Sequence, residues 1–155
     1  YKEIPGTAVI PKIETQKGVD NIDSIFEKYD EVMLGRGDLA LFSDIRNFGE
    51  NQNKVLGAAK KRKKNVIVAT DILTSLYELT IPARGELSDI FYLYSMGVKD
   101  VVASAGISMQ KSLFDRFCDL AGNFMSRTSG ETAVQVGGQA GKQTGMQAGE
   151  TAACR

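Results

Sequence analysis

The strongest constraint on the fold of this sequence is a fourfold alternation of short apolar runs and helix-like segments. Four runs rich in Val, Ile, Leu or Met, typical of strands buried on both faces, cover residues 8–13, 31–34, 65–69 and 100–103. Their first residues are 23, 34 and 35 positions apart, which suits strands joined by right-handed crossover helices. The pattern therefore predicts an α/β fold of parallel βα units, either a small open sheet or half of an eight-stranded barrel.

Each predicted strand is followed by a segment with the apolar periodicity of a helix. The first of these segments can be capped by Asp20 or Asn21, and the second runs from about residue 43 to residue 64. The third lies between Pro82 and Gly97, and the fourth can be capped by Ser108. From residue 126 the composition changes, with glycine at every fourth position from 137 to 149. We therefore expect a folded unit over residues 1–125 and a flexible or artificial tail over residues 126–155.

Composition narrows the classes of function that this chain can have. It contains 19 basic and 19 acidic residues, a balance that gives no sign of binding nucleic acid or an anionic membrane. The absence of histidine excludes Ser-His-Asp triads and His-ligated zinc sites. No apolar run approaches the roughly 20 residues that span a bilayer, and two cysteines do not make a disulfide framework. We therefore expect a cytoplasmic protein, and a first residue other than Met suggests a fragment or a processed product.

Polar residues gather just past the ends of the predicted strands, where both candidate folds place their active sites. Lys12 and Glu14 are two positions apart and point to the same side of a strand. They either form a plain salt bridge or bind a ligand together. After the second strand, Gly35 and Gly37 either make a turn or let the backbone approach an anion. Asp38 could then join Glu14 in holding Mg²⁺, because proteins bind this ion with one or two carboxylates.

Three further features of the sequence can be interpreted as purely structural or as functional. Thr70 ends the third strand as a β-branched residue, and its hydroxyl could also bond a substrate. The basic run of residues 60–64 closes the second helix and is expected to be a solvated helix end, not a phosphate-binding patch. Glu86 and Asp89 are expected to complement the dipole at the start of the third helix.

Four collinear stretches closely resemble the pyruvate kinase family. They are IPKIE at residues 10–14 with Gly18-Val19 after it, VMLGRGDL at 32–39, VIVAT at 66–70 and PARGELSD at 82–89. Single stretches would be weak signals, but the four occur in the family's order at matching spacings. The resemblance covers about residues 8–125 and implies the second half of a TIM-type (β/α)₈ barrel, with its last four strands.

The resemblance implies Mg²⁺-dependent phosphoryl transfer between phosphoenolpyruvate and ADP, giving pyruvate and ATP. Lys12 resembles the lysine that neutralises the phosphoryl group, and Glu14 and Asp38 resemble ligands of Mg²⁺ or Mn²⁺. Gly37, Asp38 and Thr70 would meet the substrate, and Arg36 would have a structural or substrate-facing role. K⁺ is a further candidate ion, whose contacts would come from strands that this chain lacks. The chain would be a homo-oligomer or would be completed by another chain, because half a barrel leaves two open edges.

Departures from the family pattern leave two alternatives open. The fourth strand ends in Ala103-Ser104-Ala105-Gly106, where the family has Ser-Gly-Glu-Thr, and Asp71 stands where the family usually has glutamine. A lyase or aldolase could use the same carboxylates to hold Mg²⁺ against a pyruvate enolate. The chain could also be a module that binds a small acid or a partner without catalysis.

Overall fold

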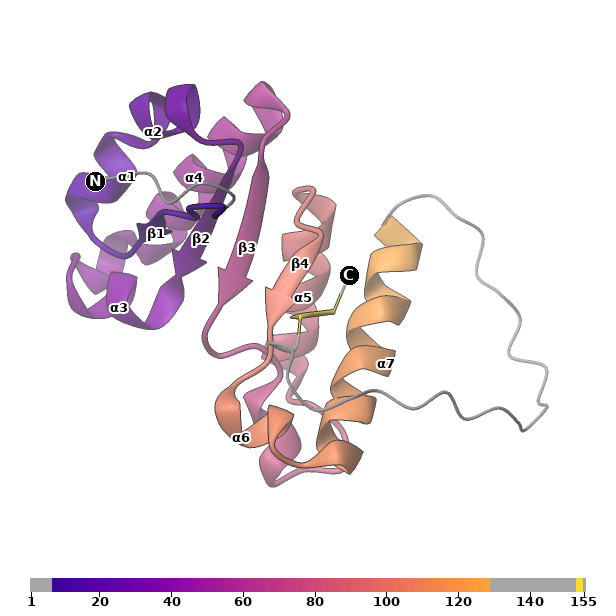
Figure 1. Cartoon of the computed structure of the whole chain (residues 1–155). Coiled ribbons are helices and arrows are strands. Elements are labelled where there is room, and N and C mark those ends of the chain that lie inside the picture. The colour runs from indigo at the N-terminus through magenta and orange to yellow at the C-terminus, as the bar shows by residue number, and fades with distance from the viewer. Residues whose placement is uncertain (1–6, 129–152, 155) are drawn as a thin grey trace.

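The computed structural model of the chain describes residues 7–128 and 153–154, and these form one sheet with helices beside it (Figure 1). Four strands are parallel and neighbour one another in chain order, and they are β1 (Lys12–Ile13), β2 (Glu31–Gly35), β3 (Asn65–Ala69) and β4 (Asp100–Val102). Doubly wound sheets reverse their strand order at a switch point, whereas a barrel adds each strand beside the last. The order β1-β2-β3-β4 therefore supports the half-barrel and not the open sheet.

A fifth strand, β5 (Ala153–Cys154), was not predicted. It pairs antiparallel with β4, with Val101 opposite Cys154 and Val102 opposite Ala153. It covers the edge of β4 at which a barrel would add its next strand. The rest of the expected tail, residues 129–152 and 155, lies outside the described residues, and the proposed division at residue 126 stays a prediction.

Helices follow every parallel strand. Their bounds are α1 (Gln16–Asp20), α2 (Ile22–Lys28), α3 (Arg36–Leu41), α4 (Phe48–Arg62), α5 (Arg84–Ser95), α6 (Ala105–Ser108) and α7 (Lys111–Thr128), with 3₁₀ turns η1 (Ile45–Asn47) and η2 (Thr74–Tyr77). In Figure 1, α1, α2 and α4 lie by β1 and β2, whereas α5 and α7 lie by β4. The short helices α3 and α6 follow the carboxyl ends of β2 and β4, where the polar residues were expected.

The two faces of the sheet differ in burial. Val32 pairs with Val66 and Leu34 pairs with Val68, and all four side chains are fully or nearly fully buried in the core. The side chains between them point the other way and are only half-buried. The expectation that the strands are covered on both faces is therefore wrong for this chain, because the described residues provide helices for one face only.

Several element boundaries also differ from the prediction. Residues 8–11 are not in a strand, so β1 has two residues where six were expected. Ser108, predicted to cap the fourth helix, is instead the last residue of α6, and the helix that follows, α7, begins at Lys111. Helices α1 and α3 were missed, because five or six residues are too short to show a helical period. Short helices of this kind depend on the packing around them more than on local propensity.

Two polar residues near the start of α4 form hydrogen bonds to neighbouring helices. Asn51 is buried and exchanges two hydrogen bonds with Gln16 of α1, at 2.9 and 3.2 Å. Asn53 accepts a hydrogen bond from Tyr92. The buried side chain of Gln52 leaves its Oε1 without a hydrogen-bond partner in the described part of the chain. These contacts fix α4 against α1 and α5, which a purely apolar pattern would not have done.

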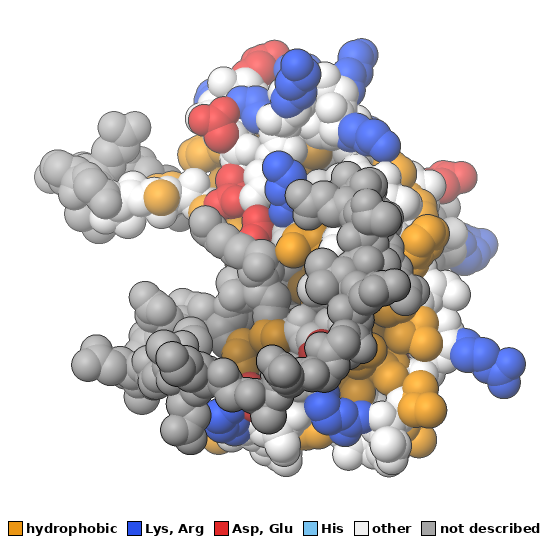
Figure 2. Space-filling model, turned by 90° about the vertical axis from the view of Figure 1, so that its right-hand side faces the viewer, with side chains coloured by type: hydrophobic (Ala, Val, Ile, Leu, Met, Phe, Trp, Pro, Cys, Tyr) orange, Lys and Arg blue, Asp and Glu red, His pale blue; other side chains and the backbone are white. Residues whose placement is uncertain are grey.

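The surface carries several large apolar side chains, and Figure 2 shows hydrophobic groups exposed between scattered basic ones. The most exposed are Val9, Leu41, Phe42, Ile45, Ile81 and Met109. None of the helices within residues 7–128 is both long and apolar enough to cross a bilayer. Cys118 of α7 is disulfide-bonded, so the small number of cysteines does not mean that both thiols stay reduced. The cytoplasmic location stays a prediction.

Candidate active site at the carboxyl ends of the strands

Lys12 and Glu14 lie side by side at the end of β1, as their spacing predicted. Lys12 is in register with Met33 of β2, and Ile13 between the two polar residues is buried with the core. The Lys12 Nζ and the Glu14 Oε1 are 2.5 Å apart. The Glu14 side chain lies against Gly35, since a Cβ added to that glycine would stand 2.5 Å from Glu14 Oε1. Gly35 thus leaves the space that the Glu14 carboxylate occupies.

Asp38 is exposed in the first turn of α3, directly after β2. The pKa of Lys12 is raised above its ordinary value, first by the hydrogen bond to Glu14 and then by the charge of Glu14. The charge of Asp38 also raises this pKa, whereas burial lowers it. Two carboxylates from neighbouring strands therefore act on one lysine ammonium group.

Thr70 and Gly37 meet across β2 and β3. A Cβ added to Gly37 would stand 2.8 Å from the Thr70 Cγ2, so glycine is required for this approach. Thr70 has φ of 76° and Asp71 has φ of 55°. Positive φ is costly for a β-branched residue and is found where the surrounding structure imposes it. The third strand therefore ends in a strained turn, and Thr70 is held against the loop that carries Asp38.

Arg36 binds the backbone of this turn. Its side chain is buried, and its guanidinium donates to the Thr70 carbonyl from both Nε and Nη2 at 3.1 Å and to the Asp71 carbonyl at 2.8 Å. Its Nη1 is 2.6 Å from Asp89 Oδ2 of α5. Of the two roles that the sequence left open for Arg36, these contacts support the structural one, because its donors face protein atoms.

Glu86 and Asp89 are more than dipole-complementing residues, which corrects the ordinary reading of the sequence. Asp89 is the ion-pair partner of Arg36. Glu86 accepts hydrogen bonds from the hydroxyl and backbone of Ser75 and from the hydroxyl of Thr74. Burial raises the pKa of the Glu86 carboxyl, but these hydrogen bonds outweigh burial and lower it below its usual value. The only sequence signal for these contacts was the motif PARGELSD at residues 82–89, since no local periodicity marks them.

The carboxyl end of β4 differs from those of the other three parallel strands in the side chains around it. Ser104 hydrogen-bonds to the hydroxyl of Tyr77, which reaches over from η2 at 3.1 Å. The Tyr77 ring lies directly over Gly106, where an added Cβ would overlap its hydroxyl oxygen at 1.7 Å. Tyr77 was missed by sequence reasoning, because nothing in its local pattern sets it apart. It fills space at the β4 end with an aromatic ring that is 44% exposed.

The residues around Lys12 fit a hard divalent cation held by few protein ligands. No group of three or more His, Cys, Asp or Glu suited to a metal occurs in the described residues. Glu14 and Asp38 supply two carboxylates whose charges both act on Lys12. Mg²⁺ usually takes one or two carboxylates and fills its other positions with water and substrate oxygens. The donor set is thus adequate for Mg²⁺ and too small for a closed structural site.

Comparison with known proteins shows which family this chain resembles. Residues 2–109 match the family model described as pyruvate kinase, barrel domain. The pyruvate kinase of Aeropyrum pernix is 37% identical over 83 residues, which are 54% of this chain and 18% of the relative. That of Thermotoga maritima is 40% identical over 89 residues, covering 57% and 18%. That of Mycobacterium intracellulare is 34% identical over 103 residues, covering 66% and 22%.

The matched region and the site coincide. Every residue described above at the strand ends, from Lys12 to Gly106, lies inside the match, and the parallel sheet with strands in chain order has the character of part of a TIM barrel. The chain spans about a fifth of the length of the curated relatives it matches. With more than half of its residues matched to the barrel domain, the chain belongs to the pyruvate kinase family.

Proposed function

We propose that this chain carries the metal- and lysine-bearing half of a site for phosphoryl transfer between phosphoenolpyruvate and ADP. The observation that supports it most is the joint placement of Lys12, Glu14 and Asp38 at the ends of β1 and β2. Phosphoryl transfer depends on positioning and charge neutralisation more than on covalent chemistry, so the absence of histidine is no obstacle.

Each residue has a role that its surroundings suit. Glu14 and Asp38 would hold Mg²⁺, which would neutralise charge on the oxygens of the phosphoryl group and the enolate. Lys12 keeps its proton, because its pKa is raised, and would meet the phosphoryl group as a cation. The backbone at Gly37 would approach the substrate carboxylate, and Thr70 would place its hydroxyl beside the enolate. Arg36 would position Thr70 through its carbonyl without contacting the substrate.

Metal binding is the first test of this proposal. We expect Mn²⁺, titrated into the 155-residue chain and followed by electron paramagnetic resonance, to bind at one site. Glu14→Gln and Asp38→Asn should each weaken binding at least tenfold, since each removes a charged ligand. Asp23→Asn is the matched control, because Asp23 pairs with Arg62 on the helical side of the sheet. Binding that is absent, or unchanged in the two site variants, would favour a module that does not catalyse.

Product analysis separates the two enzymatic possibilities. The open reading frame that contains this chain should be expressed whole and supplied with phosphoenolpyruvate, ADP and Mg²⁺. ATP and pyruvate formed in equal amounts would support phosphoryl transfer. The lyase alternative draws its support from the β4 end, where the sequence Ala103-Ser104-Ala105-Gly106 departs from the motif that the resemblance implies. A parallel reaction with Mg²⁺ and a 4-hydroxy-2-oxo acid, without ADP, tests that alternative, because cleavage of its carbon–carbon bond gives pyruvate and an aldehyde. Release of both products there, with no ATP formed in the first reaction, would establish the lyase.

We also propose that the half-buried face of the sheet is completed by further strands, from another chain or a second copy. Met33 and Ile67 lie on that face beside Lys12, and neither is fully covered. The outer edge of β1 has no neighbouring strand in the described part of the chain. Open edges and half-covered apolar faces promote association. Sedimentation of the 155-residue chain as a monomer at all concentrations would contradict this proposal.

A further inference from the structure

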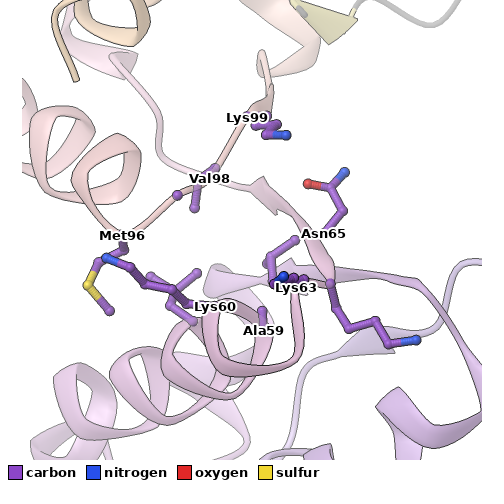
Figure 3. A pocket seen from close by; sticks show the side chains of 11 residues that line it. Ala59, Lys60, Lys63, Asn65, Met96, Val98 and Lys99 are labelled. Carbon is purple, nitrogen blue, oxygen red and sulfur yellow. The ribbon is translucent and has the colours of Figure 1, made fainter. Parts of the chain in front are cut away.

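A cavity of about 380 Å³ opens at the amino ends of β3 and β4, away from the candidate active site. It lies between the last turn of α4 and the loop that joins α5 to β4, and Figure 3 shows it from close by. Asn65 begins β3 at this cavity and Thr70 follows the other end of the strand. At roughly 3.3 Å per residue, about 16 Å of strand separates the two places.

Four lysines line the cavity, and two of them are already engaged. Lys64 pairs with Asp30. Lys60 donates to the Ser95 carbonyl at 3.4 Å, where it complements the partial negative charge at the end of α5. Lys60 and Lys64 therefore have partners within the protein. For these two lysines, the contacts agree with the prediction that the basic run of residues 60–64 is an ordinary helix end.

The other two lysines of the cavity, Lys63 and Lys99, have no such partners among the described residues. Within residues 7–126 neither side chain forms a salt bridge or a side-chain hydrogen bond. In Figure 3, Lys63 comes from the end of α4 and Lys99 from the start of β4, on two different walls. Lys63 also has φ of 56° at the position where helices normally end in glycine. A lysine here accepts a backbone cost that glycine would avoid.

No aspartate or glutamate is among the described residues that line this cavity. Glu31 and Asp100 both accept hydrogen bonds from the amide of Asn65, the second at 2.9 Å. Asp30 is taken by Lys64. The lining itself therefore carries positive charge from two walls, which attracts an anion.

The remaining lining of the cavity is apolar. Leu56, Val66 and Val98 are buried beneath it, and Met96 is half-buried beside it. A cavity of this volume falls in the range that binds small molecules. An inorganic anion would use the lysines alone, whereas a ligand with an apolar body would also cover this floor.

We propose that this cavity binds a small phosphate monoester with an apolar or aromatic body, at a site separate from the candidate active site. The phosphate would lie between Lys63 and Lys99, and the body would lie on Leu56, Val66 and Val98. Phosphate carries close to two negative charges at neutral pH and accepts several charge-assisted hydrogen bonds. Two lysines without other partners match that charge.

The test uses phenyl phosphate titrated into the 155-residue chain by calorimetry, in metal-free buffer. We expect it to bind about tenfold more tightly than orthophosphate, because only the ester covers the apolar floor. Benzyl alcohol, which has the ring without the charge, should not compete. Competition by benzyl alcohol, or equal affinity for the two phosphates, would overturn the proposal.

Variants locate the bound phosphate. Lys63→Gly and Lys99→Gln should each weaken the binding of phenyl phosphate about tenfold, the loss expected for one charge-assisted contact. Lys63→Gly relieves the positive φ, so its melting temperature should not fall, and lost binding cannot then reflect unfolding. Lys61→Gln, in the same basic run but outside the cavity, is the control. Unchanged affinity in both cavity variants, or loss of binding in Lys12→Gln instead, would refute this site.

Discussion

The carboxyl ends of β1, β2 and β3 are joined by interlocking side chains, whereas the residues after β4 meet the exposed ring of Tyr77. At the first three strands, Gly35 and Gly37 leave room for Glu14 and Thr70, and buried Arg36 ties the third strand to α5. At β4, the hydroxyl of Tyr77 meets Ser104 above Gly106. The first region contains the stretches on which the resemblance rested, and the second contains Ala103-Ser104-Ala105-Gly106, where a different motif was expected. The comparison teaches that the side-chain contacts which hold the first three strand ends come from α3, α5 and the strands themselves, although β4 pairs with β3 farther along the sheet.

The largest effect should come from removing the cation of the three-strand region. In the intact reading frame, Lys12→Gln should lower the rate of ATP formation by about 10²–10³-fold, the usual loss when one charge-stabilising group is removed. A coupled assay for ATP measures this rate. Lys17→Gln, an exposed lysine of α1, is the control and should keep full activity. Equal rates for Lys12→Gln and wild type would remove the lysine from the proposed mechanism.

Arg36→Met should give the next largest effect, on stability. It leaves the Asp89 carboxylate and two backbone carbonyls without their donor, and we expect unfolding free energy to fall by about 2–4 kcal/mol. Urea unfolding followed by circular dichroism measures this change. Arg84→Met, exposed at the start of α5, should change stability by no more than about 0.5 kcal/mol. A small loss for Arg36→Met would mean that the strained turn at Thr70 holds without it.

Two glycine substitutions compare the regions directly. In Gly37→Ala the new methyl group meets the β-branched Thr70, whose backbone is fixed, so a loss of about 1–3 kcal/mol is expected. In Gly106→Ala it meets the far end of Tyr77, which is partly exposed and can swing into solvent. Alanine also gains up to about 1 kcal/mol over glycine in helix α6, so the net change should be near zero. Urea unfolding of both variants decides the comparison, and an equal loss in both would show that the β4 end is as rigid as its neighbours.

The smallest effect expected is a pH-dependent change in stability, caused by Glu86, which binds Thr74 and Ser75 between the two regions. The pKa of Glu86 is lowered in the folded chain, so its contribution to stability is full above its unfolded pKa and is lost as pH falls through the folded value. Glu86→Gln should therefore be less stable than wild type at pH 7, and the difference should shrink as pH falls below about 4. Urea unfolding at several pH values measures this. A difference that stays constant with pH would show that packing, and not the charge, makes Glu86 useful.

The sequence alone predicted much of this fold, for reasons that are local. Short apolar strands, intervals of 23 to 35 residues between them and polar strand ends are visible without any tertiary contact. The sequence also predicted that Lys12, Glu14, Asp38 and Thr70 lie near one another, because parallel strands bring their carboxyl ends to one edge of a sheet. These residues do lie at that edge, and their catalytic roles stay proposals.

Tertiary structure alone decided the contacts that run between distant parts of the chain. Arg36 meets Asp89 across 53 positions, and Tyr77 meets Ser104 across 27, distances over which no periodic pattern carries information. The strained φ of Thr70 and the short helices α1 and α3 likewise depend on packing that local propensity opposes or ignores. Local chemistry therefore specified which residues stand at the strand ends, and long-range packing specified how those residues are held, because only folding brings their supports together.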